Sequence, residues 1–334
     1  MPSMGAGGAG GALRAWWRPV GSRQSSRRRD RVGDVALRTA STVAAVLGVV
    51  LIGVIAYQIL HGAGESISKF GPGFLFHSRW QPNFGVFGAG VFLFGTVVSS
   101  LFALVLAVPL AISIGLFLAT VAPSGVRRVI GPLVEMLAAI PSVILGFWGI
   151  VVLAPFVQAH LEPALNGALG WLPIFGTPST TGTGIFTASL ILTIMVVPII
   201  ASVSRDLFLA VPRELREGAT ALGATRWEVV RGILLPSTFS GLVAASFLGL
   251  GRALGEAIAT TQVIGAGTAI HASLFAPGNT LAAGIADEYF SATSKLHVSS
   301  LFYLGAILLA IGLLANLAAQ RIVRRFDVYN LALK

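Results

Sequence analysis

The stretch that decides the fold is VPRELREGATALGATRWEVVRGILLP, residues 211–236, a polar segment enclosed by two long apolar ones. Its pattern predicts two short helices joined at a tight turn. Pro212 suits a first helical turn, and Gly223 suits a left-handed cap at the end of the first helix. Thr225, with Glu228 three residues later, predicts a capping box that starts the second helix.

Pro236 closes this segment, and we expect it to break the chain before the next apolar stretch, because a proline interrupts a helix. The small residues Gly218, Ala219 and Ala221 leave one surface of the first short helix without bulk. A partner protein could therefore approach this helix closely.

The apolar stretches around this segment belong to a chain whose composition is typical of a membrane protein. The 334 residues are 55% hydrophobic and only 11% charged, whereas soluble domains carry about 25% charged residues. Membrane lipid is therefore the expected solvent. The sequence contains no cysteine, which excludes a disulfide framework and thiolate chemistry.

Six apolar stretches are long enough to cross a bilayer, so we predict an all-α, polytopic fold. Their approximate ranges are 39–60, 90–122, 129–157, 184–204, 237–266 and 299–320. The second exceeds the ~30 Å apolar core, and we expect Pro109 to kink it or its end to lie along the interface. The third contains Glu135 and Pro141, so its first part is also compatible with an interfacial helix.

The distribution of cations predicts the orientation of these spans. Most of the 23 lysines and arginines lie before the first span, in the segment 211–236 or at the C-terminal end, whereas the opposite loops hold only Lys69, Arg79 and Lys295. The positive-inside rule then places both termini in the cytoplasm. Because membrane topology already accounts for the net charge of +10, we expect no nucleic-acid partner.

The spans divide the chain into three parts. Residues 1–34 form an Arg- and Gly-rich head that we expect to be disordered and cytoplasmic. Residues 35–325 form the transmembrane domain, with residues 211–236 as a cytoplasmic loop, and residues 326–334 form a cytoplasmic tail. All five histidines fall in or beside the predicted external loops, where we expect them to be solvated.

Arg252 and Glu256 are charged residues inside the fifth predicted span. A regular helix places Arg252 about 24 Å beyond Pro236, where an arginine costs about 2.5–3.5 kcal/mol and must face a cavity or a partner. Glu256 follows at i+4, so the two can pair. Two interpretations remain open. Either the charges neutralise each other inside a helix bundle, or Arg252 offers its guanidinium fork to an anion while Glu256 holds or releases it.

The segment 211–236 resembles the EAA loop of the permeases of ATP-binding-cassette (ABC) importers, with a small residue in place of the first alanine of the family pattern. In that family the loop is the coupling helix, which sits in a groove of the ATPase subunit. The resemblance implies ATPase coupling roles for Glu217, Gly218, Ala219, Gly223, Ala224 and Pro236.

The stretch GRALGE, residues 251–256, resembles the G-R-A-x-G-E segment of phosphate-specific importer permeases, where a membrane arginine and glutamate are linked to phosphate passage. The external loop 61–89 resembles PstC-type rather than PstA-type permeases, and the likeness extends over about residues 35–325. Other matching elements are Phe70-Gly71-Pro72, Trp80 with Pro82, Phe84-Gly85, Gly95-Thr96, Pro109-Leu110, Ile140-Pro141-Ser142 with Gly146, and Met195 with Pro198.

This resemblance implies the type I, MetI-like permease fold, with Arg252 and Glu256 in the pathway of phosphate. The implied partners are a PstA-like second permease subunit, PstB-like ATPase subunits and a PstS-like external phosphate-binding protein. The chain itself has only three lysines, and none follows a G-x-x-x-x-G run. It therefore lacks the Walker A sequence of an ATPase, and we expect a transport subunit and not an enzyme.

Alternatives in other classes remain open. The chain could be a permease for another oxyanion, such as sulfate or molybdate, an ion-coupled secondary transporter, or a membrane-bound enzyme. The absence of a His, Asp and Glu cluster at catalytic or metal-ligand spacing argues against the enzyme. For Glu135, a pair with Arg128, a pair with a charge on another helix, and a simple position at the cytoplasmic interface are all possible, and we favour the last.

Overall fold

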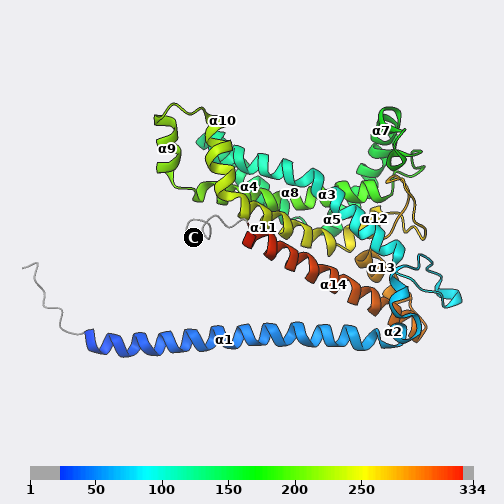
Figure 1. Ribbon diagram of the computed structural model, residues 1–334. Coiled ribbons are helices and arrows are strands. Elements are labelled where there is room, and N and C mark those ends of the chain that lie inside the picture. The colour runs from blue at the N-terminus through cyan, green and yellow to red at the C-terminus, as the bar shows by residue number, and fades with distance from the viewer. Residues whose placement is uncertain (1–22, 326–334) are drawn as a thin grey trace, which may run out of the picture. The chain divides into compact units, whose positions relative to one another are not determined.

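The computed structural model describes the backbone of residues 23–325 and the side chains of residues 33–325. In this part of the chain the fold is all-α, without a strand (Figure 1). The chain divides into two compact units, one up to Tyr57 and one from Gln58 onward. The predicted fold class is confirmed.

The first unit contains the greater part of α1 (Arg23–Gly62). The sequence predicts a disordered head over residues 1–34, but the helix already begins at Arg23, so the prediction is wrong for residues 23–34. No proline interrupts these residues, and each residue added to an existing helix gains a hydrogen bond. Residues 1–22 and the expected tail, 326–334, lie outside the described residues.

The second unit contains the other helices. The α-helices are α2 (Gly64–Phe70), α3 (Gly90–Leu116), α4 (Ser124–Ala138), α5 (Ser142–Trp148), α6 (Ala154–Phe156), α7 (Glu162–Leu169), α8 (Ile185–Ala210), α9 (Arg213–Ala221), α10 (Arg226–Val229), α11 (Leu235–Leu254), α12 (Ile258–Val263), α13 (Leu281–Glu288) and α14 (Lys295–Arg325). Short 3-10 helices are η1 (Gly71–Leu75), η2 (Pro82–Phe84), η6 (Pro173–Phe175) and η8 (Tyr289–Ser291). Wider π-helical turns are η3 (Phe117–Val121), η4 (Gly149–Leu153), η5 (Val157–Leu161) and η7 (Val230–Leu234).

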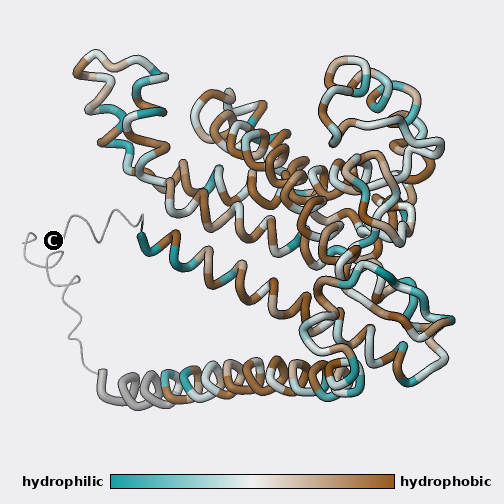
Figure 2. The backbone as a smooth tube through the Cα atoms, turned by 45° about the vertical axis from the view of Figure 1, so that its right-hand side comes forward, coloured by the Kyte–Doolittle hydropathy of each residue, from teal (hydrophilic) through white to brown (hydrophobic). Residues whose placement is uncertain are grey.

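Six helical stretches of the described residues are long and apolar enough to cross a membrane, as the sequence predicts. They are Gly33–Gly62, Gly90–Val121, Ser142–Leu169, Ile185–Ala210, Arg226–Leu254 and Lys295–Arg325. Figure 2 shows hydrophobic residues along these stretches, while hydrophilic residues gather in the α9–α10 region and in the last turns of α14. The chain is therefore a multi-pass membrane protein.

The third span begins later than the predicted range of 129–157. The helix α4 is separate and ends before Pro141, and the span itself is Ser142–Leu169. A proline disfavours helical backbone at the residue before it, which explains why the two helices do not merge. The alternative in which the first part of this range is not a span agrees with the structure.

The helix α8 forms the centre of the second unit. In its most apolar part, 78% of the residues are buried, against 28% in each of the other spans of this unit. On α3, Ala103, Ala107 and Ala111 recur every four residues, are fully buried, and belong to the same core cluster as Val196 and Ile200 of α8. Such small residues let membrane helices approach closely, because dispersion contacts replace the hydrophobic effect there.

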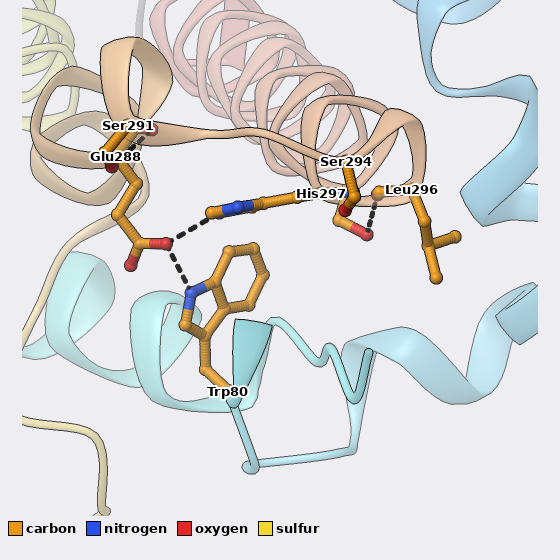
Figure 3. Close-up of polar contacts among 7 residues, drawn as sticks. Trp80, Glu288, Ser291, Ser294, Leu296 and His297 are labelled. Carbon is orange, nitrogen blue, oxygen red and sulfur yellow. Dashed lines mark hydrogen bonds and ion pairs between the residues drawn. The ribbon is translucent and has the colours of Figure 1, made fainter. Parts of the chain in front are cut away.

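A carboxylate of α13 joins two segments far apart in the sequence (Figure 3), at the end of this unit opposite α9 and α10 (Figure 1). One oxygen of Glu288 accepts a hydrogen bond from Trp80 Nε1 at 2.8 Å, and His297 Nε2 lies 2.8 Å from the same oxygen. His297 is 6% exposed and stacks on Phe87. The expectation that every histidine is solvated is therefore wrong for His297, because sequence alone does not reveal its distant partner.

Glu288→Ala is expected to lower the thermal stability of the protein. The substitution removes the acceptor of Trp80 Nε1 and of His297 Nε2, and an unpaired buried polar group costs about 1–3 kcal/mol. Thermal unfolding in detergent measures the effect. Asp287→Ala is the matched control, since this neighbour is exposed, and equal melting temperatures for the two variants contradict the anchoring role.

Candidate functional site

Arg252 lies in the last turn of α11, directly before a break in the helix. The helix ends at Leu254, and the chain resumes helical form as α12 at Ile258. The predicted fifth span, 237–266, is therefore wrong beyond Leu254. The local signal for this break is Gly255, because glycine weakens a helix through its backbone freedom.

At this break Arg252 and Glu256 form an ion pair, with 3.3 Å between Nη2 and Oε2. The Glu256 side chain is only 5% exposed, whereas that of Arg252 is 46% exposed. The second oxygen of Glu256 accepts a hydrogen bond from the backbone N–H of Ala259 at 3.1 Å, at the start of α12. Glu256 is thus held in place from two sides, and the ion pair fixes one edge of the guanidinium.

A cavity of about 700 Å³ adjoins Arg252 between α8, α11 and α14. Much of its lining is apolar or small, as at Phe247, Leu248 and Gly312, and no carboxylate of the described residues lines it. Apart from the pair with Glu256, the N–H groups of Arg252 make no hydrogen bond to another described residue. This arrangement suits an oxyanion, which a guanidinium can bind through two parallel hydrogen bonds.

The second group of predicted site residues lies in the α9–α10 hairpin, which we define as residues 213–229 (Figure 1). Gly223 has φ +90°, so it forms the predicted left-handed cap after α9. The Thr225 hydroxyl accepts from the backbone N–H of Glu228 at 3.3 Å, and the Glu228 carboxylate accepts from the backbone N–H of Thr225 at 2.7 Å. The predicted capping box is therefore confirmed.

One side of the α9–α10 hairpin packs against the spans. Ala219 and Ala224 are half-buried against a cluster that includes Phe208 and Leu234. Glu217 is exposed. One side of the hairpin therefore packs against the membrane helices, while Glu217 remains exposed to another molecule.

The hairpin also exposes large apolar side chains that sequence reasoning missed. Leu215, Leu222 and Trp227 are 52%, 91% and 65% exposed. A Cβ atom added at Gly218 would have no neighbour within 4 Å outside the adjacent backbone of its own helix. The sequence did hold a signal for this surface, namely a tryptophan and two leucines within a polar loop, where a solvated loop needs no large apolar residue. Exposed apolar side chains gathered in one place mark a surface for another protein.

Pro236 does not break the chain, contrary to the sequence prediction. Helical backbone continues from Arg226 to Leu254, and the π-helical turns of η7 directly precede the proline. A proline lacks the N–H that an α-helix needs, and wider turns absorb such an interruption. One continuous helix therefore links the hairpin to Arg252, which lies about 26 Å along the axis from Leu235.

Glu135 makes an ion pair with a neighbouring helix. Its Oε1 lies 2.8 Å from Arg205 Nη1 on α8, and Arg205 also pairs with Asp206 at 2.9 Å. The favoured interpretation, a simple interfacial position, is therefore wrong, and the alternative of a charge on another helix is right. The two helices are adjacent only in the folded chain, so sequence spacing does not show the pair.

Comparisons with known proteins agree on one family. Residues 111–328 match the model of the family described as binding-protein-dependent transport system inner membrane component. A Mesorhizobium japonicum protein named phosphate transport system permease protein PstC is 41% identical over 92% of this chain and 94% of its own length. The protein of the same name from Haemophilus influenzae is 42% identical over 85% of this chain and 90% of its own length.

A mycobacterial relative and a solved structure extend the comparison. Phosphate transport system permease protein PstC 2 of Mycobacterium tuberculosis is 40% identical over 87% of this chain and 92% of its own length. A chain of a bacterial alginate ABC transporter, solved with its alginate-bound periplasmic protein, is 15% identical, with a TM-score of 0.57 over 88% of this chain and 97% of that chain. At this identity the structural likeness supports the fold alone.

Proposed function

The chain belongs to the PstC branch of the binding-protein-dependent inner-membrane transport components, and on that premise we propose that it conducts inorganic phosphate as a permease subunit of an ABC importer. The observation that carries the proposal is the position of Arg252. Its guanidinium pairs with Glu256 at one edge, and Arg252 also lines a largely apolar cavity. An anion crossing the membrane needs such a site, because a charge without a partner is costly there.

The proposal assigns ATP hydrolysis to a separate subunit. The sequence has no Walker A run, and the exposed apolar residues of the α9–α10 hairpin suit a groove on another protein. We place this hairpin and both termini in the cytoplasm, following the cation distribution. The remaining partners are then a second permease subunit and an external phosphate-binding protein.

The mechanism we propose is alternating access. The phosphate-binding protein docks on the external loops, and ATP closes the two ATPase subunits, which draws the α9–α10 hairpins together. The continuous helix from Arg226 to Leu254 transmits this movement to Arg252, because packed helices shift as rigid bodies. The spans then rock and expose the cavity beside Arg252.

Reconstitution of the purified complex into liposomes tests the proposed function. We expect uptake of labelled phosphate only when the ATPase subunits, the binding protein and ATP are all present. Uptake driven by an ion gradient without ATP identifies a secondary transporter instead. If sulfate or molybdate inhibits the uptake of labelled phosphate as strongly as unlabelled phosphate does, the transported substrate is another oxyanion.

A further inference from the structure

The cavity beside Arg252 contains two further polar side chains, Asn316 and Gln320 of α14. Both side chains are exposed, and neither makes a hydrogen bond to another described residue. The N–H and carbonyl groups of the two amides are therefore open to a molecule from outside this chain.

Their spacing places the two amides on one face of α14. Gly312, Asn316 and Gln320 recur every four residues and all line the cavity, so they form a stripe along the helix. α11 begins beside the α9–α10 hairpin and ends near Arg252, while α14 runs the opposite way and ends toward the hairpin (Figure 1). Gln320 thus lies about 6 Å nearer to the hairpin end than Asn316.

We propose that Asn316 and Gln320 continue the oxyanion path from Arg252 toward the hairpin end and select for a protonated oxyanion. This inference rests on the proposed function. Each carboxamide offers N–H donors to the oxygens of the anion and a carbonyl oxygen that accepts a hydrogen bond. Phosphate keeps at least one P–O–H group at neutral pH and can donate to that oxygen, whereas sulfate has no proton to donate. The amides therefore favour phosphate over sulfate.

Two double variants separate this role from packing. Asn316→Asp with Gln320→Glu keeps the shape of both side chains but replaces the N–H donors by acidic oxygens. Asn316→Leu with Gln320→Leu removes donor and acceptor together. Arg252 is unchanged in both. In the reconstituted complex we expect the KM for phosphate to rise about tenfold or more in each, since hydrogen bonds to charged groups are lost.

Two results test the inference: the order of the KM values for phosphate among the variants, and the inhibition of phosphate uptake by sulfate. We expect the acidic pair to be at least as impaired as the leucine pair, although it is closer in shape to the native residues. We also expect sulfate to inhibit phosphate uptake more strongly in the leucine pair than in the native protein. Leu317→Ala changes an exposed neighbour outside the cavity and should leave the KM and the inhibition by sulfate at native values.

The possible failures are distinguishable. Native KM and native rejection of sulfate in both double variants overturn the inference, even when Arg252→Ala is inactive. Loss of the second permease subunit on purification overturns it as well, because the amides then serve an interface between subunits. Uptake that survives Arg252→Ala contradicts the site in the proposed function itself, before either amide is considered.

Discussion

Arg252→Ala is expected to abolish phosphate uptake, by about a hundredfold or more, while the assembled complex still purifies intact. The loss follows from removing the guanidinium that faces the cavity, since two hydrogen bonds between charged groups contribute about 1.5–3 kcal/mol each. Uptake of labelled phosphate by liposomes containing the complex measures the effect. Normal uptake by this variant removes Arg252 from the pathway.

A second variant decides between the two interpretations of the ion pair. In Arg252→Ala the Glu256 carboxylate loses its partner, so a loss of uptake could reflect an uncompensated charge. Arg252→Ala combined with Glu256→Gln removes both charges but keeps an acceptor for the N–H of Ala259. If the double variant regains uptake, the arginine serves only to neutralise Glu256. If it remains inactive, the guanidinium itself binds the anion.

Gly218→Leu is expected to lower phosphate uptake at least about tenfold by weakening the attachment of the ATPase subunit. The space around Gly218 is open in this chain, so the substitution should not disturb the fold of the hairpin. The added side chain instead occupies the surface on which we place the ATPase. Co-purification of the ATPase subunit and ATP-dependent uptake measure the result.

Gly125→Leu is the matched control for this prediction. Gly125 lies in the first turn of α4, outside the α9–α10 hairpin, and also has open space around it. Its substitution should leave both co-purification and uptake near the native values. Full attachment of the ATPase in Gly218→Leu contradicts the coupling role of this surface. If both variants lose ATPase attachment and phosphate uptake equally, the protein is sensitive to a large side chain at either glycine, and the effect is not specific to the hairpin surface.

The sequence predicted those features that depend on neighbouring residues. The number of spans follows from the length of the apolar stretches, because a bilayer accepts only long apolar helices. The cap at Gly223 and the box between Thr225 and Glu228 follow from backbone conformation and from hydrogen bonds within one turn. These interactions form wherever the local pattern occurs, so they can be read without knowing what surrounds them.

Helix boundaries near glycine and proline were less predictable. The sequence suggested a break at Pro236 and a continuous helix through Gly255, and the structure has the reverse at both places. Wider turns absorb the proline, while Glu256 turns away from α11 to bind the N–H of Ala259. At Pro236 the folded chain thus overruled a local preference, whereas at Gly255 the break follows the weakness of glycine in a helix.

By itself, the sequence determined that this is a six-span membrane protein with a charged pair in its fifth apolar stretch and a polar segment before it. Only the tertiary structure decided that Glu135 pairs with Arg205, that His297 shares the Glu288 carboxylate with Trp80, and that Asn316 lines the same cavity as Arg252. The physical reason is distance along the chain. Hydrogen bonds and ion pairs act over a few ångströms, and packing of the spans alone brings these distant residues within that range.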